Sequence, residues 1–155
     1  MADKQVEVST EIHADAQKLY DLVAELTEMG NWSPENTGGR WIGGATGPAV
    51  GAKFRGSNRS GWRRWSTTVQ VTEADRGKRF SFRVTFAAVP IADWAYDFKD
   101  TGTATVVTET WTDLRPWWME KGSAPVMGVW NRPEHNRANM EATLEALKRG
   151  AEAAR

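Results

Sequence analysis

Hydrophobic and polar residues alternate through most of the middle of the chain, as in β-strands that bury one face. The clearest strand covers residues 79–86 and places on one face Phe80, Phe82, Val84 and Phe86. Similar alternation predicts strands at residues 4–12, 40–42, 53–59 and 65–74, after Pro90, and at 103–113. Short turns such as Asp75-Arg76-Gly77 join these segments, so they predict an antiparallel sheet.

Helical periodicity appears on both sides of this strand-rich region. Asp15 opens a segment whose apolar residues recur every three or four positions, at Ala16, Leu19, Tyr20 and Val23. A short helical turn is expected over residues 27–31, ending before Pro34 because a residue that precedes proline disfavours the helical conformation. A long C-terminal helix is expected from the cap residue Asn131, with one stripe formed by Met140, Thr143, Leu144 and Leu147. The glycine-rich residues 36–52 read as turns and a loop around the short strand.

This order of elements predicts one α+β domain over residues 1–155. We expect a seven-stranded antiparallel sheet wrapped around the long C-terminal helix, with two short helices after the first strand. The inward positions of the sheet are mostly large aromatic residues. A curved sheet closed by one helix often leaves an apolar cavity between the two layers, so the pattern also predicts a ligand pocket.

The amino-acid composition further limits the kinds of site that the protein can contain. The 155 residues include nine tryptophans and no cysteine, which excludes thiolate catalysis and thiolate metal sites. The start of the chain lacks a basic and then apolar leader, and no apolar run approaches the length of a membrane span. We therefore expect a cytoplasmic protein with no stable membrane insertion, either a monomer or a homodimer.

The twenty acidic and twenty basic residues cancel in total but are segregated along the chain. Residues 1–36 carry eight acids and two bases, whereas residues 37–83 carry ten bases and two acids. A basic region of this kind can bind nucleic acid. The alternative, which the alternation favours, is that arginines occupy the solvent face of the sheet, so we expect no nucleic-acid partner.

Four segments resemble a known family. They are residues 6–23, Trp32-Ser33-Pro34-Glu35, the hairpin of residues 69–82, and the ending that runs from His135-Asn136 to Leu147-Lys148. The chain resembles the helix-grip fold of the START and Bet v 1-like (SRPBCC) superfamily, and within it the bacterial polyketide cyclase/dehydrase and lipid-transport group. The resemblance implies a ligand-binding fold. It implies no catalytic residue, because the superfamily contains carriers, lipid transporters and aromatic cyclases without a shared catalytic motif.

Glu109 is the first candidate for chemistry, because it is in line with Val107 and Trp111 on its strand. On the inner face its burial would raise its pKa and suit it to acid–base work. The opposite face carries Val106, Thr108 and Thr110, so the alternation leaves open an exposed or ion-paired glutamate. Tyr96 and His135 are the other proton-transfer candidates, although His135 also fits a surface position at the start of a helix.

The predicted ligand-binding residues are those on inner faces or near the ends of the cavity: Trp32, Phe54, Asn58, Phe82, Phe86, Trp94, Tyr96, Glu109, Trp111, Trp130, Met140 and Leu144. No metal is expected, because His13 and His135 are far apart and lack a spaced carboxylate partner. No phosphate-binding loop or other cofactor motif is present, so no cofactor is expected. Glu35 is expected to cap a turn.

Three functions are consistent with these features. The first is binding or carriage of a hydrophobic small molecule, aromatic or lipid-like. The second is a polyketide cyclase or dehydratase that uses Glu109, Tyr96 or His135. The third is an interaction protein that uses the basic sheet face or the pair Trp117-Trp118.

Overall fold

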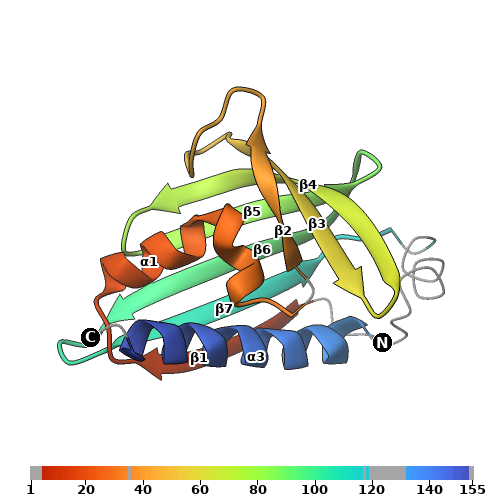
Figure 1. Cartoon of the computed structure of the whole chain (residues 1–155). Helices are drawn as coiled ribbons and strands as arrows, with labels where there is room; N and C mark the ends of the chain where they lie inside the picture. Colours follow the sequence, from red (N-terminus) through yellow and green to blue (C-terminus); the bar gives the residue numbers. More distant parts are fainter. Residues whose placement is uncertain (1–4, 35, 117, 119–131, 154–155) are drawn as a thin grey trace.

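The computed structural model describes residues 5–34, 36–116, 118 and 132–153. Seven strands form one antiparallel sheet in the order β1-β7-β6-β5-β4-β3-β2 (Figure 1). The elements are β1 Gln5–Ile12, α1 Ala16–Ala24, η1 Leu26–Asn31, β2 Asn36–Ile42, β3 Lys53–Ser60, β4 Arg63–Asp75, β5 Arg79–Phe86, β6 Val89–Asp100, β7 Thr105–Asp113 and α3 Arg132–Ala153. This is the predicted α+β helix-grip arrangement.

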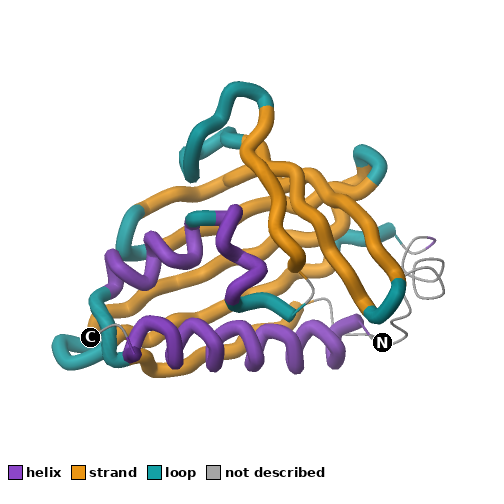
Figure 2. Tube along the Cα trace, in the orientation of Figure 1, coloured by secondary structure: helices purple, strands orange, loops and turns teal. Residues whose placement is uncertain are grey.

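The helices lie on one face of the sheet, and α3 runs along its β1 edge (Figure 2). α1 packs on β5 and β6, α3 packs on β1 and β7, and η1 packs on β2. Asp15 begins α1 as predicted, because its carboxylate accepts a hydrogen bond from the Lys18 backbone N–H at 3.3 Å. No helix among the described residues is long and apolar enough to cross a membrane.

The alternation in sequence places one side chain in two toward the helices. Phe80, Phe82 and Val84 of β5 are buried, as are Val69 and Val71 of β4. Tyr20 of α1 closes this end of the core, with its ring in edge contact with Phe80 and Phe98 at centroid distances of 5.8 Å each. The inner faces predicted for these strands are therefore confirmed.

Strand β2 is longer than the predicted 40–42, because two glycines that read as turn residues belong to it. Gly38 has φ +112°, and the ladder to β3 shifts beside it, between Asn36 and Gly38. At Gly39 a Cβ would lie 2.2 Å from the Arg55 carbonyl oxygen and 2.5 Å from the Phe54 ring. Glycine is needed here because the backbone passes directly over that ring.

Candidate functional site

A cavity of about 480 Å³ lies between the inner face of the sheet and α3. Its size falls in the range of small-molecule sites, about 300–1,000 Å³. The described residues that line it are Leu26, Met29, Ser33, Asn36, Phe54, Gly56, Asn58, Arg64, Trp65, Thr67, Val69, Phe82, Val84, Phe86, Ile91, Ala92, Trp94, Tyr96, Glu109, Trp111, Arg115, Trp118, Asn136, Asn139, Met140 and Thr143. Arg64 and Trp118 are exposed to solvent, so the cavity reaches the surface.

Aromatic rings line the cavity in a row set by strand register. Phe82 of β5 is opposite Trp94 of β6, and Trp94 is opposite Trp111 of β7. Phe54 of β3 is opposite Val69 of β4, which continues the apolar wall toward the other edge. Directly opposite residues share a face, so these side chains present one apolar surface to the space under α3.

A carboxyl group interrupts this apolar wall. Glu109 is 2% exposed, and the alternation of β7 places it inward with Val107 and Trp111. Tyr96 is directly opposite on β6, and its hydroxyl donates a 2.7 Å hydrogen bond to Glu109 Oε2. Oε1 of the same carboxyl group is buried and has no hydrogen-bond partner among the described residues. The cavity wall therefore holds one polar atom with unused hydrogen-bonding capacity.

Burial decides the protonation state of this pair. Loss of solvation raises the pKa of Glu109 from its ordinary 4.5 to about 8, although the Tyr96 hydrogen bond acts in the opposite direction. Burial, and then the nearby Glu109, raise the pKa of Tyr96 well above its usual value of 10. At neutral pH the site therefore holds a neutral carboxylic acid beside a neutral phenol, and the acid has a proton to donate.

Further polar groups sit at the ends of the cavity. Asn58 of β3 donates a 3.2 Å hydrogen bond to the Thr67 hydroxyl on β4. α3 contributes Asn136, Asn139 and Thr143 to the lining. At the end of β7, the guanidinium of Arg115 and the carboxylate of Asp113 form a largely buried ion pair with a shortest N–O distance of 2.9 Å. These groups can orient the polar end of a bound molecule.

Nine of the residues predicted to bind ligand lie around this cavity: Phe54, Asn58, Phe82, Phe86, Trp94, Tyr96, Glu109, Trp111 and Met140. Trp32 and Leu144 are placed elsewhere. The Trp32 ring packs over α3, where a Cβ at Gly150 would lie 2.8 Å from its Cζ3 atom. Leu144 is 1% exposed and belongs to the solid core. His135 is at the start of α3 and is not among the described lining residues.

Four residues singled out in the sequence, Glu35, Trp117, Trp130 and the expected cap residue Asn131, lie outside the described residues. The sequence reasoning missed the polar lining from α3 and the charged residues at the cavity ends, Arg64 and Arg115. Helical spacing could have indicated the first group, because Asn136, Asn139 and Thr143 fall on the same stripe as Met140. Among the residues that the structure describes, no three His, Cys, Asp or Glu side chains gather as a metal site.

Solved structures similar to this chain share its fold. The polyketide-cyclase-like protein Cgl2372 of Corynebacterium glutamicum is 29% identical, with a TM-score of 0.66 over 97% of this chain and 92% of its own. The di-domain ARO/CYC protein StfQ from the steffimycin biosynthetic pathway is 12% identical, with a TM-score of 0.76 over 97% of this chain. DynU16, a protein of the dynemicin biosynthetic locus, is 16% identical, with a TM-score of 0.65 over 99% of this chain.

The two less similar structures show the fold alone, and this chain spans about half of each, 51% of StfQ and 49% of DynU16. A search of curated protein sequences gives no match. The family described as "Polyketide cyclase / dehydrase and lipid transport" matches residues 3–152, nearly the whole chain. With its fold and its sequence in agreement, the chain belongs to this polyketide cyclase/dehydrase and lipid transport family.

Proposed function

We propose that this protein binds and carries a hydrophobic small molecule, aromatic or lipid-like, in the cavity under α3. The observation that carries the proposal is a ring-lined space of about 480 Å³ whose wall contains a buried carboxyl oxygen without a hydrogen-bond partner in the described part of the chain. Flat apolar ligands gain affinity by replacing water against the rings of Trp94, Trp111 and Phe82. We place this binding in the cytoplasm, by a monomer or a homodimer.

The state of Glu109 suggests the polar group of the ligand. A neutral carboxylic acid can donate one hydrogen bond from the oxygen that Tyr96 does not occupy. A ketone, ester or ether oxygen would accept that bond inside the cavity. We therefore propose an apolar ligand with a neutral oxygen acceptor, and a polyketide-like aromatic ketone is one molecule of this class.

Quenching of tryptophan fluorescence by matched ligands tests this proposal. The probes are a tricyclic aromatic ketone and the hydrocarbon of the same shape. The wild type should bind both saturably and prefer the ketone about 5- to 10-fold, the value of one neutral hydrogen bond. Glu109→Met should remove the preference, whereas Glu109→Gln should keep it because its amide N–H can still donate.

A variant that fills the space provides the control. Ala92 is 6% exposed and lines the cavity, so Ala92→Phe should abolish binding of both probes. Native mass spectrometry of protein from its own host should show an apolar ligand on the wild type and none on Ala92→Phe. The proposal is wrong if no aromatic or lipid probe quenches the wild type saturably, or if Glu109→Met keeps the preference for the ketone.

The pKa of Glu109, about 8, also supports an enzyme as the second candidate. In this mechanism Glu109 gives its proton to a ketone oxygen while water removes a proton from the adjacent carbon. The products are an enol and a Glu109 carboxylate, and the reverse steps return both protons. Tyr96 stays protonated and holds the carboxyl group in place. Enolisation of this kind is a step that a cyclase or dehydratase requires.

Proton exchange separates the enzyme from the carrier. An enzyme should accelerate hydrogen–deuterium exchange at the carbon next to the ketone of the bound probe, and the rate should fall as pH rises through about 8 and the acid is lost. Glu109→Gln should abolish the exchange while it keeps binding. If the wild type exchanges the proton only at the uncatalysed rate, the enzyme hypothesis is refuted and the carrier hypothesis remains.

A further inference from the structure

The structure places most of the basic residues from one segment of the chain on a single surface. Residues 36–72 contain six basic residues and no acidic residue. Five of the six are exposed on the outer face of β2, β3 and β4: Arg40, Lys53, Arg55, Arg59 and Arg64. These five residues are called the basic face below.

Strand register places like charges directly opposite one another on the basic face. Arg40 of β2 is paired with Arg55 of β3, and Arg59 of β3 is paired with Arg64 of β4. Like charges in such positions destabilise a sheet. Arg55 donates a 3.2 Å hydrogen bond to the neutral Thr68 hydroxyl, and no described residue forms an ion pair with any member of the face.

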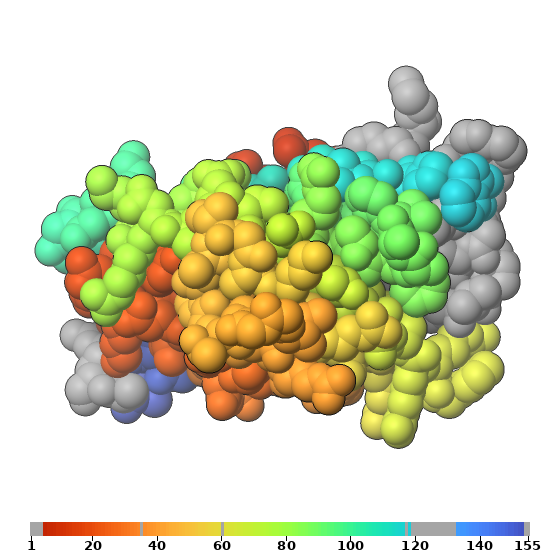
Figure 3. Space-filling view, turned by 90° about the horizontal axis from the view of Figure 1, so that it is seen from above, coloured from red at the N-terminus to blue at the C-terminus, as the bar shows by residue number. Residues whose placement is uncertain are grey.

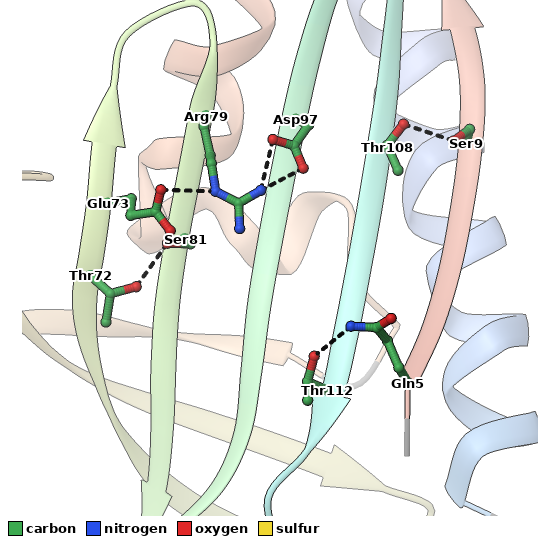
Figure 4. Close-up of polar contacts among 9 residues, drawn as sticks. All are labelled: Gln5, Ser9, Thr72, Glu73, Arg79, Ser81, Asp97, Thr108 and Thr112. Carbon is green, nitrogen blue, oxygen red and sulfur yellow. Dashed lines mark hydrogen bonds and ion pairs between the residues drawn. The ribbon is translucent and has the colours of Figure 1, made fainter. Parts of the chain in front are cut away.

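The arginines that follow in sequence form ion pairs. Each of three arginines is neutralised by a carboxylate on a neighbouring element: Arg76 by Asp21, Arg79 by Glu73 and Asp97, and Arg83 by Asp93. Neutral polar pairs bridge further strands of the outer surface, and Figure 4 shows them with the Arg79 cluster. The basic face is thus where cations without a carboxylate partner gather in the described fold, and the exposed Lys78 lies apart from it.

The basic face borders the opening of the cavity. Arg64 belongs to the basic face and also lines the cavity. Its neighbour Trp65 and the half-exposed Trp118 line the cavity as well. At the turn between β3 and β4, Trp62 is 80% exposed, and the Arg63 guanidinium lies 4.4 Å from the centre of its ring. This hairpin protrudes from the body of the molecule (Figure 3).

We propose that the basic face and Trp62 dock on a membrane surface that contains anionic lipids, where the cavity exchanges its ligand. Phosphate headgroups supply the negative charge that the five cations lack, and tryptophan favours the membrane–water interface. The choice of a membrane rests on the proposed function, because a ligand that fits an apolar cavity partitions into lipid.

Nucleic acid fits this surface less well. Single strands bind basic surfaces on which aromatic rings stack the bases. Between the arginines of the described basic face lie Ser57, Ser66 and Thr68, so the face has charge without stacking rings. The exposed ring of Trp62 is at the tip of the hairpin, where it can enter a headgroup layer.

Co-sedimentation with vesicles tests the proposal. The wild type should bind phosphatidylcholine vesicles that contain phosphatidylglycerol, bind pure phosphatidylcholine weakly, and dissociate as salt is raised. Arg59→Gln/Arg64→Gln should weaken binding about 25-fold, since each cation near an anionic surface contributes roughly fivefold. Trp62→Ala should weaken binding without changing its dependence on salt.

A control with the same loss of charge is available. Lys78 and Lys99 are exposed cations outside the basic face, and Lys78→Gln/Lys99→Gln should bind vesicles like the wild type. Arg59→Gln/Arg64→Gln should unfold at no lower denaturant concentration than the wild type, because it relieves a like-charge pair, so a loss of binding cannot be attributed to unfolding.

Three outcomes would overturn the membrane proposal: no binding to anionic vesicles, equal losses in the two double variants, or binding to RNA or an acidic protein without binding to vesicles. Quenching by the aromatic probes in free solution separates this failure from failure of the cavity function. Arg40→Gln/Arg55→Gln removes two cations of the face that do not line the cavity, so it should weaken vesicle binding and still bind the ketone probe. A protein that binds vesicles but no probe would instead refute the ligand-binding proposal.

Discussion

Replacing Glu109 by glutamine should make the protein more stable at neutral pH, by an amount that depends on pH. Glutamine has the shape of glutamate, remains neutral at every pH, and its side-chain oxygen can still accept the Tyr96 hydroxyl. The wild-type carboxyl group, in contrast, must stay protonated in the fold although water would ionise it. The variant removes that penalty and little else.

The magnitude follows from the difference between the two pKa values. Below pH 4.5 both the folded and the unfolded chain hold the proton, and Glu109 has no effect. Between pH 4.5 and about 8 only the unfolded chain releases it, so the free energy of unfolding falls by about 1.4 kcal/mol per pH unit. At pH 7 the wild type should be less stable than Glu109→Gln by about 3 kcal/mol, and above pH 8 by about 5 kcal/mol.

Urea unfolding followed by tryptophan fluorescence measures this difference, with both proteins studied from pH 4.5 to pH 8.5. The difference between the two curves isolates Glu109 from all other titrating groups. A gain of about 3 kcal/mol should also raise the melting temperature at pH 7 by roughly 6–12 °C for a chain of this size. Glu7→Gln is the control, because it makes the same change on an exposed position of β1 and should give no such gain.

Equal stabilities of wild type and Glu109→Gln at pH 7 would refute the reasoning. So would a difference that stays constant with pH, because a neutral buried acid requires the difference to grow as pH rises. A variant that is less stable at all pH values would show that Oε1 has a charge-dependent partner in the folded protein. In each case the neutral acid, and the hydrogen-bond donor that the ligand proposal uses, would be absent.

Three further changes have expected outcomes. Tyr96→Phe should raise the pKa of Glu109 above about 8 in an NMR titration, because it removes the hydrogen bond that lowers it; an unchanged or lower value would contradict this. Gly150→Ala should lower the free energy of unfolding by about 1 kcal/mol and shift the Trp32 indole resonance, because crowding of the ring outweighs the better helix former; a gain in stability would contradict it. Ala88→Gly should raise stability by about 1 kcal/mol, because Ala88 has φ +65° in the β5–β6 turn; no gain in urea unfolding would show that this conformation is not strained.

The strands and their inner faces could be predicted because each strand buries one side. Where large apolar residues alternate with arginine, serine or threonine, as in β5, a shift of one residue would expose the whole core face. In β2 the glycines prevent this alternation from being recognised. Gly38 and Gly39 have no side chain to mark a face, and glycine is rare in strands, so a paired strand read as a loop.

The side of Glu109 could not be read from its own strand, because both faces of β7 carry valine or threonine. The neighbouring hairpin contains the missing information. The turn joins Asp100 to Thr105, and strict antiparallel pairing from that point places Tyr96 opposite Glu109 and Trp94 opposite Trp111. Register counted from the turn, rather than periodicity, locates the carboxyl group beside the phenol.

Trp32 shows a different limit, because its position depends on a contact across the chain. The residue follows η1, but its ring packs over α3 where Gly150 leaves space for it. Nothing near Trp32 in sequence specifies that glycine. A tryptophan can fill the core or line a cavity with the same local pattern, and the choice depends on which partner residue is small.

Two energetically costly arrangements in this fold involve the cavity, the buried Glu109 carboxyl group in its wall and the Arg59–Arg64 pair beside its opening, and this is a reason to treat the cavity as functional. A sequence selected for stability alone would place an apolar side chain at Glu109 and would separate Arg59 from Arg64. Glutamine at these positions should therefore stabilise the protein. Arg59→Gln/Arg64→Gln should also weaken membrane docking, whereas Glu109→Gln should keep ligand binding and, in an enzyme, abolish proton transfer. If Glu109→Met kept the preference for the ketone and Arg59→Gln/Arg64→Gln kept vesicle binding, these costs would have no counterpart in function, and the site would have to be sought elsewhere.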